Sequence, residues 1–171
     1  MLMSNGMETV GNLFDYALEL ERATETLYRQ IGRMFAHAPD VELFWSHYAD
    51  EERGHALYLE RIQQEVDAGR LSAAADHGMM VDVQNCLGAT TLKRLESVRN
   101  LEDAYQLASE LENAEINSIF EFMVMNFSTD ELARSHKFLR VQLSKHLAQL
   151  ETGLPNQYRS SLARQGLAVL G

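Results

Sequence analysis

Apolar residues recur at alternating steps of three and four along four long segments of this 171-residue chain. This spacing places them on one face of an α-helix, because a helix turns once in about 3.6 residues. The segments cover residues 8–35, 41–66, 101–126 and 128–151. β-Branched residues form no alternating run that would indicate a strand. We therefore predict an all-α protein.

The connections between these segments indicate how the helices are arranged. Residues 37–40 form a short break that includes Pro39, so the first two helices are expected to be antiparallel neighbours. Ser128 and Glu131 form a capping-box pattern at the start of the last helix, which follows the third closely. Two antiparallel hairpins are the predicted result.

The segment between the hairpins is long. Residues 67–99 contain three glycines, and we expect them to form a crossover with a short helix near 90–98. A short amphipathic helix is predicted at about 156–170. The whole chain, residues 1–171, is expected to be a single domain whose bundle covers about 8–151.

The two hairpins also resemble each other in sequence. Residues 17–21 read Ala-Leu-Glu-Leu-Glu, and residues 108–112 read Ala-Ser-Glu-Leu-Glu. The last glutamate of each motif is followed 34 residues later by a histidine, His55 in the first hairpin and His146 in the second. The chain therefore contains two copies of one hairpin.

Several carboxylates and imidazoles lie at positions where a core residue is expected. An ionised carboxylate inside a bundle costs several kcal/mol unless it is paired or binds a metal. No lysine or arginine lies on the same helix faces to neutralise these groups. Oxygen and nitrogen ligands together suit iron, manganese or zinc, and glutamates can bridge two ions. The predicted metal ligands are Glu21, Glu52, His55, Glu112, Glu115 and His146.

These motifs resemble the ferritin-like superfamily, in which two helices each provide a glutamate and two others each provide Glu-x-x-His. The pattern is most similar to rubrerythrin, whose third helix carries an additional glutamate one turn on, as Glu112 and Glu115 do here. The resemblance implies a ferritin-like four-helix bundle with a dinuclear, di-iron centre. It also implies oxidoreductase chemistry of the peroxidase or ferroxidase type.

Two features depart from the rubrerythrin pattern. Leu143 stands where the fourth helix of the family has a glutamate, so one ion loses a carboxylate that Glu115 could replace. Cys86 is the single cysteine, so the four-cysteine rubredoxin-like iron site of typical rubrerythrins is absent and electrons would come from an external donor. The alternative is a non-catalytic metal-binding module that holds zinc or a single iron. Leu143 favours this alternative.

Charge and hydropathy limit the possible partners. The formal net charge is −10, without a basic patch, which argues against binding nucleic acid or anionic lipid. No apolar run is long enough to span a membrane, and residues 1–10 do not resemble a signal peptide. We expect a cytoplasmic protein, and a homodimer, because ferritin-like bundles usually pair.

Other polar residues near the predicted ligands receive structural interpretations. Glu51 is expected to be a surface residue, and His136 a polar core residue or a neighbour of the metal ligands. Tyr28 and Tyr48 are expected in the core, where either could hydrogen-bond a ligand.

Overall fold

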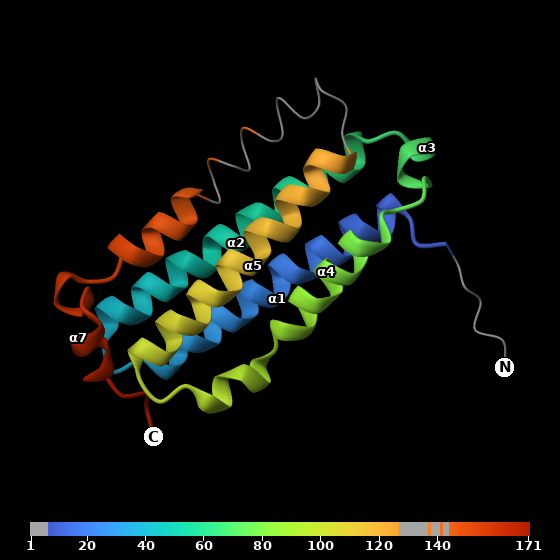
Figure 1. Ribbon diagram of the computed structural model, residues 1–171. Coiled ribbons are helices and arrows are strands. Elements are labelled where there is room, and N and C mark those ends of the chain that lie inside the picture. Colours follow the sequence, from blue (N-terminus) through green and yellow to red (C-terminus); the bar gives the residue numbers. More distant parts are fainter. Residues whose placement is uncertain (1–6, 127–136, 138–140, 142–143) are drawn as a thin grey trace, which may run out of the picture.

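A computed structural model describes residues 7–126, 137, 141 and 144–171, and the side chains of all of these except 116–126. Three long helices dominate the described part: α1 (Val10–Met34), α2 (Pro39–Glu65) and α5 (Leu101–Asn126). A fourth helical segment covers residues 144–152. In Figure 1 these four segments lie roughly along one direction, as helices of a bundle do. The predicted all-α bundle is confirmed.

The bounds of the first hairpin follow from local chemistry. The Thr9 hydroxyl accepts a hydrogen bond from the Asn12 amide, and the Asn12 side chain accepts one from the Thr9 amide, so α1 begins at a capping box. Pro39 is the first residue of α2, a position at which its missing N–H costs nothing. The Ser128 capping box predicted for the other hairpin lies outside the described residues.

The crossover contains more helix than the sequence indicated. Between α2 and α5 lie α3 (Ala68–Leu71), α4 (His77–Ala89) and the 3-10 helix η1 (Leu92–Ser97). The predicted short helix near 90–98 corresponds to η1, but the 13-residue α4 was not predicted. Helix α4 buries Met79, Met80 and Val83, and it packs against α1 and α5. This packing stabilises a helix whose own glycines disfavour it.

The carboxyl-terminal tail is less helical than predicted. Only the 3-10 helix η2 (Asn156–Tyr158) and the short α7 (Ser161–Gln165) form within 156–170. The remainder is held by an isolated β-bridge between Ala168 and Asn100, next to the start of α5. Leu167 and Val169 pack against the core through this bridge, whereas Leu162 remains 80% exposed. Pairing with the bundle therefore replaces the last turn of the expected helix.

The core has two apolar ends with a polar section between them. On α1, Val10, Leu13 and Phe14 belong to one apolar cluster, and a second cluster begins at Leu27. The buried Glu21 lies between the two. Within the described residues, no helix is both long and apolar enough to cross a membrane.

Candidate metal centre

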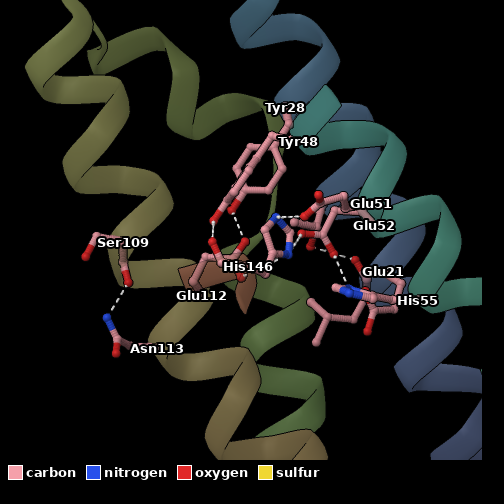
Figure 2. A network of polar contacts seen from close by, with 12 residues as sticks. Glu21, Tyr28, Tyr48, Glu51, Glu52, His55, Ser109, Glu112, Asn113 and His146 are labelled. Atoms are coloured by element: carbon pink, nitrogen blue, oxygen red, sulfur yellow. Dashed lines mark hydrogen bonds and ion pairs between the residues drawn. The ribbon is translucent and has the colours of Figure 1, made fainter. Parts of the chain in front are cut away.

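All six predicted ligands lie inside the bundle. Helix α1 provides Glu21, α2 provides Glu52 and His55, α5 provides Glu112 and Glu115, and the segment 144–152 provides His146. Their exposed fractions range from 0% to 5%. Figure 2 shows five of them, with Glu21, Glu52, His55 and His146 directed toward one another. We refer to these six side chains as the Glu/His cluster.

Glu52 lies at the middle of the Glu/His cluster. Its Oε1 is 3.1 Å from His146 Nδ1, and its Oε2 is 3.3 Å from His55 Nδ1. Glu21 Oε2 lies 3.5 Å from the same nitrogen of His55, and Glu112 Oε2 lies 3.8 Å from His146 Nδ1. The carboxylate of Glu52 thus faces the two histidines through different oxygens.

Donor atoms gather in two groups that could each hold an ion. One group consists of Glu52, His55 and His146, and the other consists of Glu21, Glu52 and Glu115. In each group every residue offers one ligand atom, and these three atoms lie within 4.8 Å of one another. Both groups include Glu52. A carboxylate common to two groups of ligands is the arrangement that a bridged pair of ions requires.

Many of these atoms have no hydrogen-bond partner among the described residues. They include both oxygens of Glu21, one oxygen each of Glu52, Glu112 and Glu115, and both ring nitrogens of His146. The described ion pairs of these carboxylates involve only histidines. Buried polar groups are nearly always satisfied, so unpaired groups that converge on one point fit a cation. Their chemistry, carboxylate and imidazole, fits iron, manganese or zinc.

Burial dominates the electrostatics of the Glu/His cluster. It raises the pKa of Glu52 and of Glu115, and neighbouring carboxylates raise both further. Burial also raises the pKa of Glu112 to about 7, although the hydrogen bond from Tyr28 acts in the opposite direction. Without a bound cation, the cluster therefore holds protons that a metal would displace.

The two histidines differ in their pKa. For His55, burial lowers the pKa, but the Glu21 carboxylate, whose Oε2 lies 3.5 Å from Nδ1, and the surrounding negative charges together outweigh burial, so the pKa is raised overall. Burial lowers the pKa of His146 to about 3, with a further contribution from His55. His146 is therefore a neutral imidazole over the physiological range, which is the form that binds metals.

Two tyrosines orient this cluster. The Tyr28 hydroxyl donates a hydrogen bond of 2.5 Å to Glu112 Oε1, which leaves Oε2 directed at His146. The Tyr48 hydroxyl donates to the backbone carbonyl of His146 at 3.2 Å, and the two rings are 3.8 Å apart. Both tyrosines are buried, as predicted, and both hydrogen-bond a residue of the Glu/His cluster.

Glu51 was expected to be a surface residue only, but its side chain also contacts the Glu/His cluster. Its side chain is about one-third exposed, and its Oε2 lies 3.9 Å from His146 Nε2. Sequence spacing could not reveal this contact, because Glu51 lies off the α2 face that carries Glu52 and His55. His136 and Leu143 lie outside the described residues.

Comparison with solved structures identifies the fold. No protein-family profile matches the sequence, and no curated protein matches it. The crystal structure of a Thermotoga maritima protein, described as a candidate ferritin-like di-iron carboxylate protein, superposes with a TM-score of 0.62 at 19% identity. The match covers 84% of this chain and 93% of the other. This chain has the ferritin-like fold.

The ferritin-like fold accounts for the position of the Glu/His cluster. Its four helices bring side chains from every element to one point halfway along the bundle. The long crossover makes α2 and α5 run in the same direction, as Figure 1 shows. The two hairpins can therefore face each other with their glutamates at one depth.

Proposed function

We propose that this protein binds two metal ions, most readily iron, at the Glu/His cluster and acts as a rubrerythrin-like oxidoreductase of the peroxidase or ferroxidase type. The observation that carries the proposal is the convergence of unpaired, buried carboxylates and imidazoles on Glu52. A bound iron pair would act as a Lewis acid and supply electrons to peroxide or dioxygen. The Thermotoga neighbour is described as a candidate ferritin-like di-iron carboxylate protein, which supports iron as the metal.

The side chains have distinct roles in this proposal. Glu52 would help to hold both ions, since its oxygens face different histidines and it belongs to both groups of donor atoms. His55 and His146 provide the nitrogen ligands, with Glu21, Glu112 and Glu115 completing the set. Tyr28 holds Glu112 in place through its hydroxyl. Glu115 stands in for the carboxylate that Leu143 does not supply, because it lies in one group with Glu21 and Glu52.

The domain organisation, location and partners are part of the same proposal. We propose a single domain over residues 1–171 that acts in the cytoplasm as a homodimer and receives electrons from an external donor. Manganese and zinc are the alternative metals, since the same ligands suit them.

A second function is favoured by Leu143 in the sequence. A fourth helix without its glutamate provides a weaker set of ligands for one of the two ions. The chain would then be a metal-binding helical module, with zinc or a single iron and no turnover.

Metal stoichiometry separates these functions. Metal-free protein is loaded with Fe²⁺ under anaerobic conditions, desalted, and its iron content per chain measured by mass spectrometry. Dioxygen or peroxide is then added, and ferric absorbance is followed against free Fe²⁺. Two irons per chain and faster oxidation support the oxidoreductase. One ion per chain without faster oxidation supports the second function. If the protein retains none of iron, manganese and zinc, both functions are rejected.

A further inference from the structure

A surface pocket lies directly beside the Glu/His cluster. Its volume is about 410 Å³, and it opens between α2 and the end of the segment 144–152. Helix α2 contributes Asp40, Leu43, Phe44, His47, Tyr48 and Glu51, and the other wall contains Gln149 and Gly153. A Cβ atom on Gly153 would lie 2.9 Å from the Phe44 ring, so the glycine allows this close approach of the two walls.

The ionisable groups of the pocket suit a cation. Asp40, His47 and Glu51 are spaced seven and four residues apart, so they share one face of α2. Among the described residues that line the pocket, none is a lysine or an arginine. A concave surface with charges of one sign concentrates ions of the opposite sign.

His146 connects this pocket with the buried ligands. The imidazole is 1% exposed, and neither of its ring nitrogens has a hydrogen-bond partner among the described residues. Nδ1 faces Glu52, whereas Nε2 faces Glu51 at 3.9 Å. Figure 2 shows dashed lines from the ring to both glutamates. An unpaired, buried donor atom is therefore directed at the carboxylate that lines the pocket.

We propose that the pocket is the loading site of the metal centre, where Glu51 captures a divalent cation and passes it to His146. The inference rests on the proposed function, because it requires that the Glu/His cluster binds metal. Metal–ligand distances of about 2.0–2.2 Å let two ligands of one ion lie roughly 3.0–4.2 Å apart. The observed 3.9 Å between Glu51 and His146 falls in that range. Tyr48 packs edge-to-face against His146 and also lines the pocket, so it keeps the imidazole at the boundary between the pocket and the buried ligands.

The rate of metal uptake tests the charge of the pocket. Metal-free protein is mixed with Co²⁺ in a stopped-flow instrument, and the visible absorbance of the bound ion reports loading. Glu51→Gln should lower the association rate roughly tenfold or more, since charged clefts accelerate association by about that factor. The final Co²⁺ content at saturation should match the unaltered protein. Glu65→Gln removes the same charge from an exposed position at the far end of α2 and should load at the original rate.

A second pair of variants tests the route without altering any charge. Leu43 lines the pocket and is 55% exposed, so Leu43→Trp should obstruct it and slow Co²⁺ uptake. Leu57 is 59% exposed on the same helix but does not line the pocket, so Leu57→Trp is the matched control.

The outcomes separate this inference from the proposed function. Slow loading with unchanged final content in Glu51→Gln and Leu43→Trp supports the loading site. If both variants load as fast as their controls, or if Glu51→Gln changes only the dissociation rate, the loading site is rejected while the metal centre stands. If the unaltered protein binds no Co²⁺, Fe²⁺, Mn²⁺ or Zn²⁺, the metal centre itself is rejected.

Discussion

Glu52 contacts both histidines of the cluster and belongs to both groups of candidate ligands. Its burial is unfavourable when the carboxylate is unpaired. The residue is therefore better explained by a bound cation than by a contribution to folding.

Replacing Glu52 by alanine should abolish metal retention while leaving helix content largely intact. The loss of metal affinity should exceed about 100-fold, since even residues that only orient ligands change affinity by about 10–100-fold. Metal content after desalting and far-ultraviolet circular dichroism measure the two effects. Glu19→Ala, at an exposed position of α1, is the control. Full metal occupancy in the Glu52 variant would show that the proposed site is wrong.

Tyr28 offers a smaller change at the same site. The Tyr28→Phe variant removes the hydroxyl that donates to Glu112, and hydrogen bonds to charged groups contribute about 1.5–3 kcal/mol. Because that hydrogen bond lowers the pKa of Glu112, its loss should raise this pKa and oppose metal binding. We expect about tenfold weaker Co²⁺ affinity at neutral pH, measured by titration.

The matched control is Tyr16→Phe, because the Tyr16 ring packs against the apolar cluster around Leu13 and not against Glu112. Equal affinities in the two variants would mean that the Tyr28 hydroxyl does not orient a metal ligand.

At the scale of the elements, the tail is attached to the bundle by an ion pair. Arg164 of α7 is 7% exposed, and its Nε lies 2.5 Å from Glu102 Oε2 on α5. The guanidinium also lies over the Tyr105 ring and donates to the carbonyls of Tyr158 and Arg159. Burial raises the pKa of Glu102, but the hydrogen bond and charge of Arg164, together with the hydrogen bond from Gln106, outweigh burial and lower the pKa overall.

Arg164→Ala should therefore lower the free energy of unfolding by about 3 kcal/mol or more, because it leaves the largely buried Glu102 carboxylate without its partner. Urea denaturation measures this loss. The exposed Arg61 of α2 serves as the control, and Arg61→Ala should change stability by less than about 0.5 kcal/mol. Metal content should remain unchanged, since α7 contributes no residue to the Glu/His cluster. Equal stabilities of the two variants would show that the ion pair does not hold the tail.

At the scale of the whole molecule, the raised pKa values couple stability to pH. Above pH 6.5 the unfolded chain has lost the protons of its glutamates and histidines. The folded, metal-free protein holds protons more tightly than the unfolded chain on Glu112, whose pKa is about 7, and on Glu52, Glu115 and His55, whose pKa values are also raised. The stability that these groups contribute is therefore lost as the pH rises through their folded-state pKa values.

The contribution of His146 to stability depends on pH in the opposite direction. Its folded-state pKa of about 3 means that its contribution is present above the unfolded value of about 6.5 and is lost as the pH falls below it. The two effects partly cancel in acid. Above pH 6.5, stability changes only through the loss of the contributions from the glutamates and His55.

We therefore expect the metal-free protein to become less stable between pH 6.5 and 8, by a few kcal/mol in unfolding free energy. Added Zn²⁺ should reverse the loss, and its stabilising effect should grow over the same range, because fewer protons must be displaced from the ligands. Denaturation series with a chelator and with Zn²⁺ measure both trends. A flat pH profile without metal would contradict the electrostatics described for the cluster.

Much of this molecule could be predicted from local sequence patterns. Helix α5 has the predicted bounds, and α1 and α2 begin or end within two residues of theirs. Each of these helices carries a periodic apolar face, and Pro39 marks the break before α2, so local sequence alone indicates them. The repeat between the hairpins also indicated that Glu21 and His55 share a depth with Glu112 and His146.

Only the tertiary structure decided the remaining features. Helix α4 forms because it packs against α1 and α5 and buries its methionines in the cluster of Val10, Leu13 and Phe14. The tail leaves the helical conformation because Ala168 pairs with Asn100. Glu51 of α2 contacts His146 of the segment 144–152, so no periodicity within α2 could reveal this contact. Local patterns determine which face of a helix is apolar. Contacts between elements far apart in the chain depend on how those faces pack against one another, and no local pattern specifies that packing.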